Sequence, residues 1–208
     1  MKSDNKKKRT LGHNKCVTAA KGREAVPFTR SPLACCLAAV LSGAPMAGYA
    51  APQGGQVTGG EGSIDYGQTT TVTQDTSRLA IDWQTFDVAA DETVRFNQPA
   101  SSSVVLNRIL DQNPSEIFGS LEANGRLFLS NPNGLIFGES ATVNAGAFVA
   151  SGLDISSDDF MAGNYRFGTT EADGGVVVNR GVIAAATGGS VTLVGSTAVI
   201  VARSPWSA

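Results

Sequence analysis

From about Leu79 onward, the chain alternates short apolar runs with turn-forming residues. Gly, Asn or Pro bounds each run, which is typical of β-strands. No stretch keeps apolar residues at the i, i+3, i+4, i+7 spacing for three turns, so no helix is expected. The expected strands are Leu79–Val88, Val104–Leu110, Arg126–Leu129, Leu135–Phe137, Ala147–Ala150, Val176–Val178 and Val191–Val194.

Part of this pattern repeats. The similar segments are Gly119–Leu129, Gly181–Leu193 and, more loosely, Ala141–Val149. Their anchors Leu121, Val143 and Ile183 are 22 and 40 residues apart, which indicates a period near 20 with one copy obscured. A repeat of short strands without helices predicts a β-solenoid, with Gly and Asn at corners that need positive φ. An antiparallel sandwich is the alternative that fits the same strands.

The first fifty residues have the order of a secretory signal. Residues 1–30 are basic and hold nine of the sixteen Lys and Arg, and residues 31–44 are apolar. The apolar segment is shorter than the roughly 20 residues that a membrane-spanning helix needs. Small residues follow, so cleavage is expected after Ala50, which would leave a mature chain of residues 51–208 that begins at Ala51. The alternative is an amphipathic or disordered tail that stays attached.

Removal of this signal would limit the chemistry of the mature chain. His13, Cys16, Cys35 and Cys36 all precede Ala51, as does every Lys. The remainder has seven Arg and sixteen Asp and Glu, a formal charge near −9. Without His or Cys it cannot form a Ser-His-Asp triad, a thiol nucleophile or a Cys/His zinc site. Its acidity disfavours nucleic acid as a partner. Carboxylate chemistry is the main enzymatic option that remains. We expect no enzyme activity, no cofactor and no metal.

Two polar segments interrupt the apolar runs. Asn131-Pro132-Asn133-Gly134 has the residue order of a tight turn, in which the two Asn side chains could bond backbone groups and lock the corner. Ser151–Gly175 breaks the rhythm and is expected to leave the solenoid wall. Its carboxylates could hold Ca²⁺ or act as an acid–base pair, although a solvated loop is the simpler interpretation. These carboxylates include Asp154, Asp158 and Asp159.

A further series of segments stands in a fixed order between Gln53 and Leu193. The segments are Gly62–Ile64, Leu79–Val88, Glu92–Pro99, Leu106–Arg108, Leu121–Gly138 and Ala150–Ser156. In order and spacing they resemble the two-partner secretion domain, also called the haemagglutination activity domain, of filamentous haemagglutinin-like exoproteins and adhesins. The long basic segment before the apolar run also resembles the extended signal peptides of this family.

The resemblance implies an all-β fold, a right-handed parallel β-helix. It also implies that general secretion machinery takes the chain to the periplasm of a Gram-negative bacterium. A cognate outer-membrane transporter would then recognise the domain through periplasmic domains and export it unfolded, so that it folds outside and is secreted or stays at the cell surface. Asn131, Pro132, Asn133 and Gly134 match a motif that the family needs for a competent domain.

Two features of the chain depart from the family pattern. The Asn-Pro-Asn-Leu signature is absent, and the chain ends at Ser204–Ala208, where family members usually continue. The chain is therefore expected to be a fragment or a truncated reading frame. One alternative to the secretion role is an adhesin that binds host glycan or protein, with the host-cell surface as a partner, although the missing repeats argue against it. The other is a β-helix enzyme that cleaves polysaccharide with carboxylates such as Asp158 and Asp159.

Overall fold

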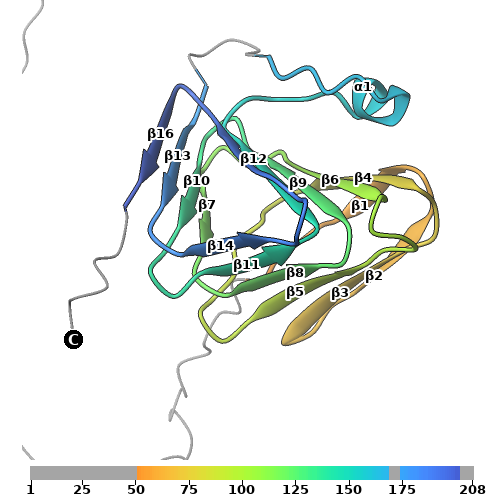
Figure 1. The fold of residues 1–208 in the computed structure, drawn as a ribbon, viewed down its shortest axis with the longest axis horizontal. Coiled ribbons are helices and arrows are strands. Elements are labelled where there is room, and N and C mark those ends of the chain that lie inside the picture. Colours follow the sequence, from red (N-terminus) through yellow and green to blue (C-terminus); the bar gives the residue numbers. More distant parts are fainter. Residues whose placement is uncertain (1–50, 169–173, 202–208) are drawn as a thin grey trace, which may run out of the picture. The chain divides into compact units, whose positions relative to one another are not determined.

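The computed structural model of the protein describes residues 51–168 and 174–201. These residues form a solenoid with three walls and carry one short helix, α1 (Ser157–Ala162), outside the walls (Figure 1). The expected cleavage site at Ala50 lies outside the described residues. The strands are β1 (Gln56–Gly59), β2 (Gly62–Asp65), β3 (Thr69–Gln74), β4 (Arg78–Trp83), β5 (Thr93–Asn97), β6 (Val104–Ile109), β7 (Ser115–Ile117), β8 (Ser120–Ala123), β9 (Arg126–Ser130), β10 (Leu135–Phe137), β11 (Thr142–Ala145), β12 (Ala147–Ser151), β13 (Val176–Asn179), β14 (Val182–Ala185), β15 (Val191–Val194) and β16 (Thr197–Ile200).

Each wall is one sheet that runs along the solenoid. The first wall has the order β1-β4-β6-β9-β12-β15, the second β2-β3-β5-β8-β11-β14 and the third β7-β10-β13-β16. In each coil the chain visits the second, first and third walls in turn, and it makes about five coils. The first coil holds β3 and β4, and the fourth holds β11, β12 and β13. Every pairing between successive coils is parallel. The expected parallel β-helix is confirmed, and the antiparallel sandwich is wrong.

The three repeat anchors stack directly on one another. Val143 pairs in register with Leu121 on one side and with Ile183 on the other. The spacing of 40 residues therefore hides no further coil, and this part of the prediction is wrong. The fourth coil is longer because the chain leaves the wall after β12, and the described part of this segment, residues 152–168, adds no strand to any wall before β13 begins.

Large apolar side chains fill the space between the three walls. Trp83, Phe86, Phe96, Phe137 and Phe148 are almost fully buried there. Two pairs of these rings meet edge to face, Trp83 with Phe86 and Phe137 with Phe148, at centroid distances of 5.4 and 5.8 Å. Because inward residues alternate with outward ones along each strand, the stacked coils share one continuous apolar core.

Buried amide side chains connect neighbouring coils. Asn107 accepts a hydrogen bond from Trp83 Nε1 (2.9 Å) and donates one from Nδ2 to the Phe128 carbonyl (3.2 Å). Gln98 donates to Gln74 Oε1 (3.1 Å) and accepts from the Gly125 N–H (2.8 Å). If neighbouring coils paired in another register, these amides would be buried without hydrogen-bond partners. The amides therefore favour the observed register.

Glycines occupy the corner between the second and first walls. The Gly146 N–H donates to the Gly125 carbonyl in the coil before (2.7 Å), and a Cβ on Gly146 would lie 2.7 Å from the same oxygen. A Cβ on Gly189, one coil further, would collide with the Gly146 carbonyl. None of these three has a positive φ, unlike Gly134 at +117°. The expectation that corner glycines serve positive φ holds for Gly188 in the same corner (φ +83°) but not for these three, where close backbone stacking excludes a side chain.

The helix α1 contradicts the expectation of no helices. Ser156 Oγ caps its start by accepting from the Asp159 N–H (3.0 Å), and Gly163 ends it with φ +83°. Its six residues cannot show a three-turn apolar period, so the sequence pattern missed it. No helix in the described part of the chain is long and apolar enough to cross a membrane.

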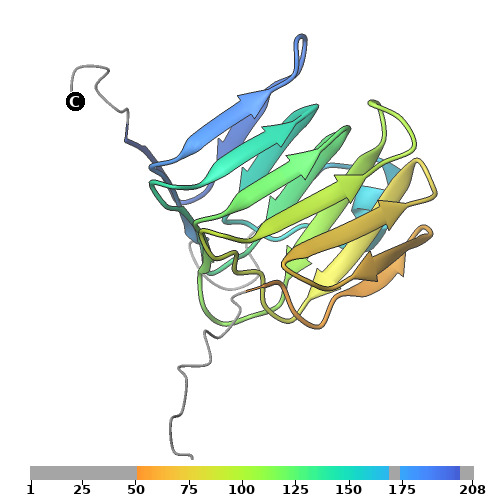
Figure 2. The ribbon, with the colours of Figure 1, turned by 90° about the horizontal axis from the view of Figure 1, so that it is seen from below.

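The two ends of the solenoid differ (Figure 2). At the N-terminal end, β1 and β2 pair antiparallel with β4 and β3 and cap the first two walls. The third wall starts one coil later, at β7, where the first coil contributes only a bridge from Val88 to Ile117. Capping strands of this kind protect a sheet edge from further pairing.

Candidate functional site

The predicted turn at Asn131–Gly134 connects β9 to β10 at the corner between the first and third walls. The Gly134 N–H donates to the Asn131 carbonyl (2.9 Å), and the Asn133 N–H donates to Asn131 Oδ1 (2.9 Å). This is a tight turn reinforced by an Asn side chain that bonds the backbone two residues on. Gly134 has a positive φ, which glycine adopts without a Cβ clash, as the sequence predicted.

Asn131 is fully buried and ties three coils together. Its Nδ2 donates to the Asn113 carbonyl and to Ser115 Oγ in the coil before, both at 3.0 Å. Its backbone N–H donates to the Ser151 carbonyl in the coil after (2.9 Å). The side chain therefore uses both amide protons and its carbonyl oxygen inside the fold.

The other three residues of the turn are placed differently. Asn133 is exposed and donates from Nδ2 to the Asp111 carbonyl (2.7 Å), and Pro132 is half-buried. Gly134 is buried, and its carbonyl accepts from the Ser115 N–H (3.0 Å). The expectation that both Asn side chains lock the corner is confirmed. Asn131 does so from within the solenoid and Asn133 from its surface.

The segment that leaves the fourth coil starts beside this turn. Ser130 Oγ donates to the Leu153 carbonyl (2.8 Å), and Ser151 Oγ donates to the same carbonyl (3.0 Å). The segment then crosses the outer face of the first wall, and α1 lies over that wall (Figure 1). There Phe160 packs edge to face on Phe128 at a centroid distance of 5.4 Å. The predicted excursion is confirmed for residues 152–168, while Ser151 belongs to the wall strand β12. The excursion carries a buried apolar face and is not simply a solvated loop.

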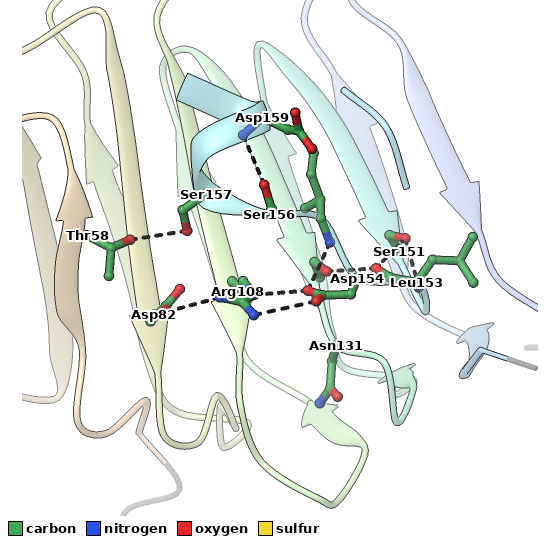
Figure 3. Close-up of polar contacts among 12 residues, drawn as sticks. Thr58, Asp82, Arg108, Asn131, Ser151, Leu153, Asp154, Ser156, Ser157 and Asp159 are labelled. Carbon is green, nitrogen blue, oxygen red and sulfur yellow. Dashed lines mark hydrogen bonds and ion pairs between the residues drawn. The ribbon is translucent and has the colours of Figure 1, made fainter. Parts of the chain in front are cut away.

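A charged cluster holds the excursion to the wall (Figure 3). Arg108 on β6 donates from Nε to Asp154 Oδ1 (2.9 Å) and from Nη1 to Asp82 Oδ2 (3.3 Å). The three side chains are only 17–27% exposed. We call these residues the Arg108 cluster. The only sign of this cluster in the sequence is the charge of Arg108 within an apolar run. Its partners Asp82 and Asp154 lie far from it along the chain.

The pKa values in the Arg108 cluster follow from burial and charge. Burial raises the pKa of Asp82 above its usual value, Arg108 lowers it in part, and the like charge of Asp154 raises it further. Burial alone would lower the pKa of Arg108, but the hydrogen bond and charge of Asp154, with the charge of Asp82, raise it above its usual value. The positive charge of Arg108 thus offsets part of the free-energy cost of burying the two carboxylates.

The acidic residues of the excursion serve separate purposes. Asp154 faces Arg108, whereas Asp158 and Asp159 are exposed in the first turn of α1. Carboxylates at that position stabilise a helix start. Within residues 51–168 and 174–201, no group of three His, Cys, Asp or Glu is placed to hold a metal ion.

Replacing Arg108 with Ala should loosen the excursion and lower the free energy of unfolding by about 2 kcal/mol, because Asp82 and Asp154 lose their shared partner. The looser excursion should appear as faster amide exchange in residues 152–168, and chemical denaturation would measure the lower free energy of unfolding. The control is Arg95→Ala, which breaks the exposed pair with Glu122 and should cost under about 1 kcal/mol. Equal losses for the two variants would contradict the assigned role of Arg108.

Comparison with known proteins gives consistent results. A family model described as the TPS secretion domain matches residues 49–205. A heme/hemopexin-binding protein of Haemophilus influenzae is 36% identical over 135 residues, which cover 64% of this chain and 15% of that protein. Another Haemophilus influenzae protein of the same description is 35% identical over 97 residues, covering 47% of this chain and 10% of that protein. The chain thus spans only a small part of the curated relatives it matches.

A solved structure supports the same assignment. The crystal structure of the HMW1 secretion domain from Haemophilus influenzae superposes with a TM-score of 0.66 at 35% sequence identity, covering 69% of this chain and 39% of that one. The family model spans more than half of this chain, and the observed parallel β-solenoid agrees with the fold that the resemblance implied. The chain therefore belongs to the TPS (two-partner secretion) domain family, the secretion domains of two-partner-secreted exoproteins.

Proposed function

We propose that this domain is the export signal of a two-partner-secreted exoprotein and that a cognate outer-membrane transporter binds it, through periplasmic domains, before it folds. The supporting observation is the burial of Asn131. Once the domain is folded, its side chain bonds Asn113 and Ser115 and is closed to any partner. A transporter that reads this side chain must therefore meet the unfolded chain.

An unfolded chain with strong strand propensity suits such a partner. It can add a strand to an exposed sheet edge of a periplasmic domain, so that backbone hydrogen bonds supply affinity and alternate side chains supply specificity. The sequence after Ala51 has no Cys. It therefore cannot form a disulfide in the oxidising periplasm that would block passage through a narrow barrel.

Outside the cell, the domain would serve as a folding template. The strands β1 and β2 close one end, and each later coil pairs with the coil before it. Coils can then stack in sequence, since each contacts mainly its neighbours. Stacking outside the membrane would bias movement of the chain outward.

A reversible crosslink tests export in the unfolded state. Arg95 and Glu122 are exposed and pair in register on adjacent coils. In-register strands lie about 4.8 Å apart, within reach of a disulfide. In a host that carries the transporter, Arg95→Cys with Glu122→Cys should accumulate oxidised in the periplasm, and reductant should restore its release into the medium.

The single-cysteine variants are the controls, because each adds a thiol without a crosslink. They should be exported like the unmodified chain, and the unmodified chain should need the transporter. Release of the oxidised double variant at the unmodified rate would contradict export in the unfolded state. Release without the transporter would contradict the proposed partner.

A further inference from the structure

A groove of about 800 Å³ lies where the third wall begins, on the N-terminal side of β7. In the first two walls the first coil contributes a full six-residue strand, β4 or β3. In the third wall it contributes only Val88, which donates its N–H to the Glu116 carbonyl (3.0 Å) and accepts from the Phe118 N–H (2.8 Å). The hollow therefore occupies the space beside a wall that starts one strand late.

Apolar groups form part of the groove surface. Val88, Ala89, Pro114 and Phe118 line it. The Phe118 side chain is 39% exposed, and its ring lies so close to Gly138 that a Cβ there would collide with it. Together with Val88, Ala89 and Pro114, this ring gives the groove a contiguous apolar part.

The charged groups of the groove have one sign. Asp87, Asp111 and Glu116 line it, and no Arg is among its lining residues. Asp87 Oδ1 accepts the Glu116 N–H (2.8 Å). Burial raises the pKa of the Asp87 carboxyl, the Glu116 N–H lowers it in part, and the like charges of Asp111 and Glu116 raise it. The groove thus concentrates negative charge beside an apolar surface.

We propose that this groove binds an extended cationic segment of a partner protein, in which Arg or Lys side chains stand next to apolar ones. The three carboxylates would receive the cationic head groups, and Val88, Pro114 and Phe118 would cover the aliphatic stems. A single metal ion fits less well, since no three acidic residues of the described chain are arranged to hold one. The site concerns the folded domain, so it goes beyond the proposed role in export.

The test uses the full chain and two synthetic nine-residue peptides, one alternating Arg with Val and the other alternating Glu with Val. The Arg peptide should bind and shift amide NMR signals of residues 87–90 and 111–118, and the Glu peptide should not bind. Replacing Asp111 with Asn and Glu116 with Gln should weaken binding about tenfold. Replacing Phe118 with Ala should also weaken it, although this variant keeps every charge.

Charge-matched controls separate the groove from the general acidity of the domain. Asp158→Asn with Asp159→Asn removes two charges from the exposed start of α1 and should leave the affinity unchanged. The amide spectrum of each variant shows whether it is folded. Equal weakening by both double variants, shifts centred outside the groove, or no binding of the Arg peptide to the folded chain would each overturn the proposal.

Discussion

Replacing Asn131 with Ala is expected to retain the protein in the periplasm and to lower the free energy of unfolding by about 3 kcal/mol. The substitution leaves the Asn113 carbonyl and the buried Ser115 Oγ without their shared donor, and the Asn133 N–H without its acceptor. Chemical denaturation measures the loss of stability. Immunodetection in periplasm and medium, with the transporter present, measures export.

Asn133→Ala is the matched control because the two Asn residues differ in burial. Asn133 is exposed, and its side chain makes one surface bond to the Asp111 carbonyl, so stability should fall by less than about 1 kcal/mol. If the transporter reads the turn sequence in the unfolded chain, Asn133→Ala should nevertheless impair export. Undiminished export of both variants would refute a role for these residues in recognition.

Replacing Gly146 with Val should lower the free energy of unfolding by about 3 kcal/mol, because the stacked corner has no space for a side chain. The Cβ alone would lie 2.7 Å from the Gly125 carbonyl oxygen, and the contacting atoms are backbone, which cannot rotate away. Relief would require the coils to separate, with loss of the hydrogen bond from the Gly146 N–H. Thermal and chemical unfolding measure the effect.

Gly168→Ala is the control for this substitution. A Cβ at Gly168 would meet nothing within 4 Å, and its φ is not positive. Alanine there should leave stability unchanged or raise it by up to about 1 kcal/mol, since it reduces the freedom of the unfolded chain. A similar loss for Gly146→Val and Gly168→Ala would contradict the steric explanation of the corner.

The sequence predicted several core-facing strands closely but missed β5, although its Val94 and Phe96 are buried. Leu135–Phe137 coincides with β10, and Val104–Leu110 differs from β6 by one residue. The strand β3 was missed because its sequence, Thr-Thr-Thr-Val-Thr-Gln, has little apolar signal, although its inward residues are buried. The strand β16 was missed in an exposed final coil. A polar strand such as β3 is recognisable only from its pairing with a neighbouring coil, here with β5.

At the candidate site too, the sequence predicted local interactions but not those between residues far apart in the chain. Turn chemistry predicted the corner at Asn131–Gly134, because Pro, Asn and Gly impose it locally. The burial of Asn131 depends on Ser115 in another coil, and the Arg108 cluster joins β6 to Asp154, 46 residues later. No single-sequence pattern encodes those distances. The helix α1 was also missed because it is shorter than the period that reveals helices.

Stacking in register has a consequence for the rate of folding. Val143 lies against Leu121, 22 residues earlier, and Phe148 lies against Leu127, 21 residues earlier. The entropy lost in closing such a loop depends on its length and not on the length of the whole chain. Folding rates fall as the mean sequence separation of contacts rises relative to chain length. A chain extended by coils of this size would keep that separation constant, so its relative contact order would decrease as it grew.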